Sequence, residues 1–128
     1  ALTNDGLQRK SVAPPTAEIV RIKAHEGEAL YQFLYGMSYL VGNGSQESDE
    51  SAAVNWVKKA ADKGFAAAEH QLGLFYLNGR GLTQDQDRAY YWIARAADKK
   101  YFTAISWMKT FKTQKTTYQK LRPTPVRP

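Results

Sequence analysis

The feature that most constrains the fold is a pattern of glycine, aromatic and alanine residues that occurs twice. The copies are offset by 37 residues at Gly36 and Gly73 and by 36 residues at Trp56 and Trp92, so the first copy carries one extra loop residue. The other shared positions are Tyr39/Tyr76, Gly42/Gly79, Gly44/Gly81, Ala53/Ala89 and the alanine pairs 60–61 and 96–97. A period of this length with a helix–turn–helix pattern is typical of a helical solenoid. Solenoids usually bind other molecules rather than catalyse reactions, so the repeat favours a binding function.

This doubled pattern resembles the Sel1-like repeat, a short relative of the tetratricopeptide repeat. The resemblance covers about residues 29 to 104 and includes the degenerate start of a third unit. In the second copy it is carried by Ala68, Leu72, Gly73, Tyr76, Gly79, Gly81, Asp85, Ala89, Trp92, Ala96, Ala97 and Ala104. Tyr31 departs from the small residue of the family, and Gly64 of the first copy becomes Lys100 in the second. Residues 107–109 replace the expected Leu-Gly, which predicts that the third unit is a capping helix.

We therefore expect an all-α fold, a short α-solenoid of two Sel1-like hairpins plus a C-terminal capping helix, with irregular termini. Residues 1–23 are predicted to be an extended N-terminal segment, 24–118 the repeat domain, and 119–128 a proline-rich basic tail. Helices are predicted at about 24–41, 66–77, 85–99 and 102–117, and one more starts between Ser48 and Ser51 and ends near Lys63. The first and second helices of a hairpin are called its A helix and B helix. Thr16 can also cap a short helix.

Small residues are predicted to set the distance between the helices of each hairpin. Gly36 and Gly73 let the A helix approach the B helix where any side chain would separate the two. The alanine pairs at 60–61 and 96–97 act in the same way from the B helix. Trp56 and Trp92 are expected to fill the groove between successive hairpins.

Composition excludes several function classes. The chain has no cysteine, which excludes a disulfide framework, a thiolate metal site and a cysteine nucleophile. No apolar run approaches the roughly 18 residues needed to span a bilayer. The chain begins at Ala1 rather than at methionine, which is compatible with a mature N-terminus after removal of a signal peptide or with a trimmed sequence, and we favour the first. This interpretation predicts a periplasmic or secreted bacterial protein.

Residues that can support catalysis or bind metal are few and isolated. His25 and His70 lack partners at the spacing of a metal site, and the acids at 49, 50, 85 and 87 precede helices, where carboxylates cap backbone amides. We expect no metal and no cofactor. Ser106 and Lys109 match the Ser-x-x-Lys motif of penicillin-interacting enzymes, an activity linked to some relatives, but the companion motifs are missing. The prediction is therefore a protein that is not an enzyme, with a penicillin-interacting enzyme as the remote alternative.

The predicted binding site is a stripe along the A helices. The resemblance implies that A helices line the concave face, so side chains outside the hairpin contact should line a groove. The predicted partner-binding residues are Leu30, Phe33, Met37 and Leu40 in the first repeat and His70, Leu74, Leu77 and Asn78 in the second. The first-repeat stripe, which continues to Val41, is wholly apolar, and an apolar helix surface must be covered.

Three occupants can cover this stripe. The first is the N-terminal segment of the chain, through Val12, Ile19, Val20 and Ile22. The second is another copy of the chain in a homodimer. The third is a helix or an extended segment of a partner protein, for which Met37 offers an adaptable surface. These arrangements can combine, with the N-terminal segment on the first repeat and a partner on the second.

The second candidate site is the basic C-terminal segment. Residues 1–98 carry a net charge of −2 and residues 99–128 a net charge of +8, so the whole positive excess lies at the C-terminal end. The predicted electrostatic residues are Lys109, Lys112, Lys115, Lys120 and Arg122. They form either an ordinary solvated helix or a docking surface for an acidic partner, an anionic membrane or a polyanion. Nucleic acid is not favoured, because no recognised motif is present.

Taken together, these features predict a non-enzymatic protein-binding adaptor or scaffold that holds a protein segment in the A-helix groove. Bacterial proteins with this resemblance include assembly scaffolds, host-interaction factors and immunity proteins that neutralise secreted toxins. A toxin or an envelope assembly component is therefore the expected kind of partner. Binding of a polyanion or an anionic membrane through the basic segment is the alternative.

Overall fold

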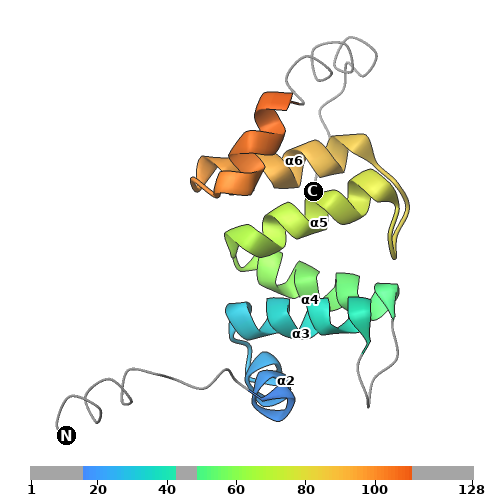
Figure 1. Cartoon of the computed structure of the whole chain (residues 1–128), viewed down its shortest axis with the longest axis vertical. Helices are drawn as coiled ribbons and strands as arrows, with labels where there is room; N and C mark the ends of the chain where they lie inside the picture. The colour runs from blue at the N-terminus through green and yellow to red at the C-terminus, as the bar shows by residue number, and fades with distance from the viewer. Residues whose placement is uncertain (1–15, 43–48, 111–128) are drawn as a thin grey trace, which may run out of the picture.

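The computed structural model describes residues 16–42 and 49–110, and within these residues it contains helices and no strand (Figure 1). The helices are α2 (Ala17–His25), α3 (Ala29–Val41), α4 (Glu50–Asp62), α5 (Ala66–Asn78) and α6 (Gln86–Asp98), followed by helical residues 102–110. They follow one another along the long axis of the molecule. The predicted all-α solenoid is confirmed. None of the described helices is both long and apolar enough to cross a membrane.

Helices α3 and α4 form the first hairpin, and α5 and α6 form the second. A Cβ atom added at Gly36 would lie 2.9 Å from Val57 Cγ2 and 3.0 Å from the Ala53 carbonyl oxygen. At Gly73 the corresponding distances are 2.5 Å to Ile93 Cγ1 and 2.9 Å to the carbonyl oxygen of residue 89. Each A helix therefore touches its B helix through a glycine, as the sequence predicts.

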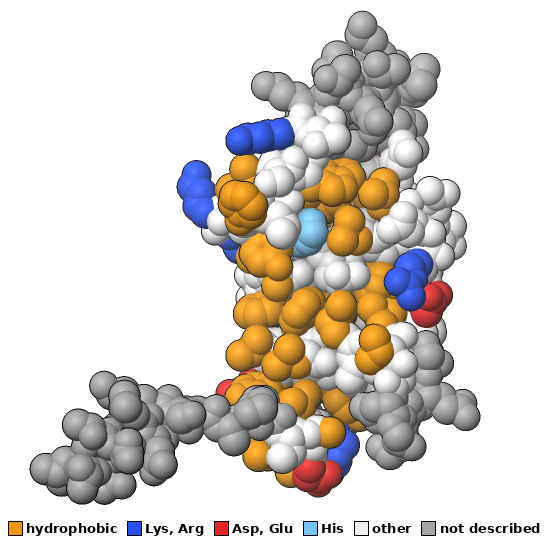
Figure 2. Space-filling view, in the orientation of Figure 1, with side chains coloured by type: hydrophobic (Ala, Val, Ile, Leu, Met, Phe, Trp, Pro, Cys, Tyr) orange, Lys and Arg blue, Asp and Glu red, His pale blue; other side chains and the backbone are white. Residues whose placement is uncertain are grey.

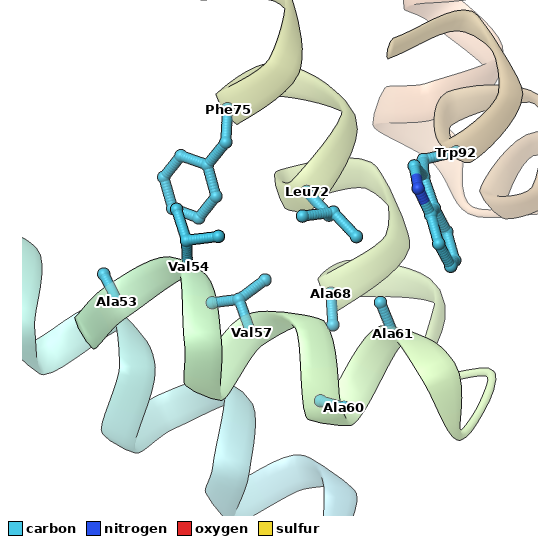
Figure 3. Close-up of a cluster of buried hydrophobic side chains, with 9 residues drawn as sticks. All are labelled: Ala53, Val54, Val57, Ala60, Ala61, Ala68, Leu72, Phe75 and Trp92. Atoms are coloured by element: carbon cyan, nitrogen blue, oxygen red, sulfur yellow. The ribbon is translucent and has the colours of Figure 1, made fainter. Parts of the chain in front are cut away.

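The largest cluster of buried side chains joins the two hairpins (Figure 3). Val54 and Val57 of α4 point toward Leu72 and Phe75 of α5, and the indole of Trp92 reaches the same cluster from α6. Trp92 therefore lies between successive hairpins, as predicted. Burial of these side chains is the main favourable term that holds one repeat on the next.

Acidic and hydroxyl side chains cap the N-termini of three helices. Asp49 accepts a hydrogen bond from the Ala52 amide at 3.0 Å, and Asp85 accepts one from the Arg88 amide at 3.0 Å. Thr16 caps α2 in the same way, since its hydroxyl accepts a bond from the amide of residue 19 at 3.2 Å. The structural interpretation of Asp49 and Asp85 is confirmed.

The N-terminal boundary differs from the prediction. Residues 17–23, expected to be extended, belong to α2, and the first A helix begins at Ala29 rather than near Ala24. The physical reason is the turn between them, in which Gly27 has a φ of +97° and ends α2. A left-handed residue of this kind is a common helix terminator, and glycine takes the conformation without steric cost.

The turn from α2 into α3 has the geometry of the two later turns that lead from a B helix into an A helix. Each holds one residue in the left-handed region and one backbone bond that closes the turn. The left-handed residues are Gly27, Gly64 and Lys100, and the closing bonds run from Glu28 to Lys23 (3.2 Å), Phe65 to Ala60 (3.1 Å) and Tyr101 to Ala96 (3.1 Å). By this criterion α2 leads into α3 in the same way as a B helix leads into the next A helix.

Three predictions lie wholly or partly outside the described residues. The last helix begins at residue 102 as expected, and its predicted continuation to residue 117 is outside. The predicted basic tail at 119–128 and most of the predicted extended segment at 1–23 are outside as well.

Candidate functional site

The A helix of the first hairpin has one face that no described element covers. Gln32 and Gly36 are buried on the opposite side of α3. Leu30 is 46% exposed and Val41 is 81% exposed, although both are apolar. Phe33, Met37 and Leu40 are half-buried at the edge of the same face, where they pack on the main core.

The A helix of the second hairpin presents the same positions with more polar residues. Leu74 and Leu77 are half-buried, His70 and Gln71 are half-buried, and Asn78 is exposed. We call this joint surface the A-face. It consists of Leu30, Phe33, Leu34, Met37, Leu40 and Val41 from α3 and of Ala67, His70, Gln71, Leu74, Leu77 and Asn78 from α5. Every partner-binding residue predicted from the sequence belongs to it.

Aromatic rings connect the A-face of each hairpin to the next turn. The Phe33 and Phe65 ring centroids lie 5.6 Å apart, and the His70 and Tyr101 centroids lie 5.5 Å apart. The two pairs occupy equivalent places in successive repeats, so one edge of the A-face is fixed by packing.

Sequence reasoning missed Leu34 and Gln71. Leu34 is 36% exposed and lies between Leu30 and Met37 on one side of α3. It directly precedes Tyr35 and Gly36, the crossing glycine of the first repeat. Its spacing of four from Leu30 and three from Met37 is the signal that places it on this face.

The described part of the N-terminal segment, helix α2, does not cover the A-face. Helix α2 lies against the opposite flank of α3, where the Gln32 amide donates to the carbonyl oxygen of Ala24 at 3.4 Å. Ile19 and Ile22, proposed to cover the stripe, are 43% and 42% exposed. That part of the expectation is wrong, because the turn at Gly27 directs α2 to the other side. Val12 lies outside the described residues.

The A-face contains no charged side chain. Figure 2 shows hydrophobic side chains across the middle of the molecule and charged ones at its margins. One marginal pair joins the two loop ends of the hairpins, with Arg80 Nη2 2.7 Å from Glu50 Oε2. A surface with this distribution favours an uncharged, largely apolar ligand surface.

The only ionisable group on the A-face is neutral near pH 7. Burial lowers the pKa of His70 from its ordinary value of 6.5. Its Nε2 atom is buried without a hydrogen-bond partner among the described residues. The imidazole therefore adds polarity to this surface but no charge.

Glu69 is a buried carboxylate next to the A-face. It is fully buried, and it accepts hydrogen bonds from Arg95 at 3.0 Å and Lys99 at 2.7 Å. Both cations belong to the B side of the hairpin, so the cluster ties α5 to the end of α6. Its role is structural, since all its bonds are made within the chain.

Three basic residues of the C-terminal segment are described, and they do not act alike. All three are exposed, and Lys99 also donates a hydrogen bond to Glu69. Lys112, Lys115, Lys120 and Arg122 lie outside the described residues. The electrostatic site predicted there stays a prediction.

The described residues offer little for catalysis or metal binding. Across 16–42 and 49–110, no three histidine or carboxylate side chains gather closely enough to hold a metal ion. Ser106 and Lys109, the formal Ser-x-x-Lys pair, are both exposed on the last described helix. An exposed pair lacks the enclosed environment that activates a serine nucleophile.

Comparison with known proteins agrees with this architecture. The model of the Sel1 repeat family matches residues 29–65 and 66–101. No match was found among the curated proteins. Sel1 repeats typically serve as protein–protein interaction modules and are generally non-enzymatic scaffolds.

Two solved structures are similar to the chain. One is c5321, a protective antigen present in uropathogenic Escherichia coli strains, with a TM-score of 0.71 and 35% identity over 77% of this chain. The other is a Sel1 repeat protein from Oxalobacter formigenes, with a TM-score of 0.67 and 36% identity over 73% of this chain. The chain spans 21% and 27% of the lengths of these two proteins. The doubled motif, the hairpin geometry and these similarities show that the chain belongs to the Sel1-repeat family.

Proposed function

We propose that the chain is a non-enzymatic adaptor that binds a segment of another protein on its A-face. The observation that carries the proposal is an exposed apolar surface, at Leu30, Leu34 and Val41, that bears no charge. Soluble proteins rarely leave such a patch without a partner. An amphipathic helix or an extended apolar segment supplies the complementary surface.

The polarity of the A-face suggests how such a segment is oriented. The part contributed by α3 is apolar, whereas α5 adds His70, Gln71 and Asn78. A segment with an apolar end over α3 and hydrogen-bonding groups over α5 fits both halves. The apolar half supplies affinity, and the polar half supplies register.

The test uses exposed positions, so that the variants keep their fold. Leu34→Glu combined with Val41→Glu places two charges on the A-face, and Lys58→Glu combined with Lys59→Glu changes exposed residues of α4 as the matched control. Capture of a partner from an extract of the source organism should be lost with the first variant and kept with the second. Circular dichroism confirms folding.

Dependence on salt separates the A-face from the basic segment. Capture through the A-face should change little between low and high salt, because apolar contacts are not screened. Capture that persists in the A-face variant and disappears at high salt would transfer the function to the basic segment. A homodimer would appear as a concentration-dependent mass that the same variant abolishes.

Toxin neutralisation outside the cytoplasm is the specific form of the proposal. Its support is that Sel1 repeats generally bind other proteins, and a toxin is one partner of that kind. Cell fractionation tests the periplasmic or secreted location. Co-expression with a captured toxin tests neutralisation, which is rejected if the intact chain and the A-face variant protect cells equally.

A further inference from the structure

A histidine occupies a ring-stacking position that holds a phenylalanine in the first repeat. The offset of 37 residues aligns Phe33 with His70, and the offset of 36 aligns Phe65 with Tyr101. The centroids of the two phenylalanine rings lie 5.6 Å apart, and those of His70 and Tyr101 lie 5.5 Å apart. The second repeat therefore keeps the geometry of the pair but replaces an apolar ring with one that can take up a proton near neutral pH.

The pair of His70 and Tyr101 joins α5 to the helix that follows α6. Phe65 is the N-cap residue of α5. Tyr101 has the same place ahead of helical residues 102–110, the last helix, because its carbonyl oxygen accepts a bond from the Ile105 amide at 3.0 Å. Each ring pair therefore connects an A helix to the start of the next helix of that type.

The last helix covers a small apolar cluster. Ala104 is 0% exposed and packs with Ile93 and Ala96 of α6, which are also 0% exposed. Leu74 of the A-face and Tyr101 pack against the same cluster. Movement of the last helix away from α5 and α6 would therefore expose apolar side chains beside the A-face.

The turn ahead of the last helix carries backbone strain. At the equivalent place in the two earlier turns, Gly27 and Gly64 adopt the left-handed conformation without steric cost. Lys100 takes a φ of 67° at this place, which is unfavourable for a residue with a side chain. The last helix is therefore the A-type helix whose docking depends most on side-chain contacts such as that of Tyr101.

The docked position of His70 has no place for a second proton. Its Nε2 atom is buried and has no hydrogen-bond partner among the described residues. An imidazolium carries a proton on both nitrogens, so protonation would create a buried, unpaired donor on a charged ring. Burial accordingly lowers the pKa of His70 from its ordinary value of 6.5.

No nearby acid offsets a positive charge on His70. The titratable or charged side chains of α5, α6 and the last helix at this end of the hairpin are Glu69, Tyr91, Arg95, Asp98, Lys99, Lys100, Tyr101 and Lys109. Glu69 is the buried acid among them, and it accepts hydrogen bonds from Arg95 and Lys99. Asp98 is exposed at the end of α6. An imidazolium at this place would therefore stay uncompensated.

We propose that His70 is a pH-sensitive switch that controls the docking of the last helix on α5 and α6. At neutral pH the uncharged ring stacks on Tyr101 and the last helix stays docked. In acid the ring takes up a proton, leaves its buried position and releases Tyr101 together with the last helix. The result is a larger apolar surface beside the A-face. The switch is a property of the chain alone and does not depend on what the A-face binds.

The direction of the pH effect follows from the two states of His70. When the last helix is released, the ring is in water and has its ordinary pKa of 6.5, whereas the pKa is lower in the docked state. Falling pH therefore favours release, beginning near pH 6.5 and levelling off below the docked pKa. One proton changes this equilibrium by at most about tenfold for each unit of pH.

Amide hydrogen exchange of the intact chain, corrected for its intrinsic dependence on pH, tests the switch. Amides of the last helix, such as Ile105, should exchange faster than Val57 of the main core and should respond less to low concentrations of urea, as in a local opening. Their protection should fall several-fold between about pH 7.5 and about pH 5.5. Exchange of Ile105 and Val57 at the same rate would overturn the proposal, because the last helix would then not open separately.

Two histidine variants show whether His70 causes the change. His70→Phe reproduces the ring pair of the first repeat and should remove the pH dependence of protection in the last helix. His25→Gln removes the other histidine of the chain, which is exposed on α2, and should keep that dependence. An equal fall in protection in the natural chain and in His70→Phe rejects His70 as the switch.

Nuclear magnetic resonance of the imidazole tests the geometry directly. Tyr101→Ala removes the ring that stacks on His70 and should raise the pKa of His70 toward 6.5. Phe102→Ala is the matched control, since Phe102 is 78% exposed, and it should leave the pKa of His70 unchanged. An equal pKa of His70 in Tyr101→Ala and in the natural chain would contradict the proposal.

Nile red, an uncharged dye that fluoresces on apolar surfaces, reports the released state. Its fluorescence with the natural chain should rise between about pH 7.5 and about pH 5.5. The rise should be absent with His70→Phe. An equal rise with both chains would show that the apolar surface opens without His70 and would overturn the proposal.

Discussion

At the scale of single residues, the two crossing glycines are the least replaceable positions of the fold. Gly73→Ala places a Cβ 2.5 Å from Ile93 Cγ1 and 2.9 Å from a backbone oxygen that cannot move aside easily. We expect a loss of about 2 to 3 kcal/mol in the free energy of unfolding. Urea denaturation measures the loss, and Gln71→Ala on the same helix is the control. An unchanged denaturation midpoint would show that α5 and α6 can move apart at this crossing without loss of stability.

At Lys100, in contrast, a substitution should stabilise the fold, because lysine is unfavourable in the left-handed backbone conformation of this position. It is the one described residue other than glycine with a positive φ, at 67°, and it stands where the first repeat has Gly64. Lys100→Gly should stabilise the chain by about 0.5 to 1 kcal/mol, since glycine takes this conformation without steric cost. Thermal denaturation measures the gain, with Lys99→Gly as the contrasting variant that loses stability.

His70 should make stability depend on pH. Burial lowers the pKa of its folded form below the ordinary 6.5, so the unfolded chain binds the proton more readily. Its contribution is present above pH 6.5 and is lost as pH falls through the folded pKa. His70→Phe, which copies Phe33 of the first repeat, should flatten the decline of stability below pH 6.5. Denaturation midpoints of both chains at several pH values test this prediction. An equal decline of stability with falling pH in the two chains would contradict a role of His70.

At the scale of elements, the buried Glu69 ties α5 to the end of α6. Glu69→Gln keeps the shape but removes the charge opposite Arg95 and Lys99. We expect a cost of about 1 to 2 kcal/mol, and a smaller cost in high salt because both cations are more than a third exposed. The first repeat has the uncharged Gln32 at the position of Glu69. Gln32→Ala is therefore the comparison in which a side chain is lost without a change of charge. Equal stability of Glu69→Gln and the natural chain would show that the pair contributes nothing net.

At the scale of the whole molecule, the two ends of the stack differ. Within the described residues, the first helix, α2, exposes Ile19 and Ile22, and the last helix carries Lys109 at the position that Gly73 occupies in α5. Lys109→Gly should allow that helix to dock on α2 of another copy, and such a head-to-tail contact grows into open oligomers. Sedimentation velocity should detect them. Lys109→Ala keeps a Cβ and should stay monomeric, and oligomers in both variants would mean that the crossing does not require glycine.

The parts of the fold that the sequence predicted depend on contacts between near neighbours in a repeat. The repeat period locates the two crossing glycines, the helix caps at Asp49 and Asp85, and the position of Trp92 between the hairpins, because each occurs at a fixed offset. The A-face could be predicted for the same reason, because residues three and four apart share one side of a helix.

The remaining features were decided by tertiary structure. A residue pattern does not say whether a neighbouring helix is present, so exposure of Leu34 and Ile19 could not be read from spacing. The partners of Glu69 lie 26 and 30 residues away in sequence and meet it only after α6 folds back on α5. The sequence by itself determined the repeat and its hairpins through short-range periodicity. Only the packed structure decided which surfaces stay open, because burial depends on every element that surrounds a side chain.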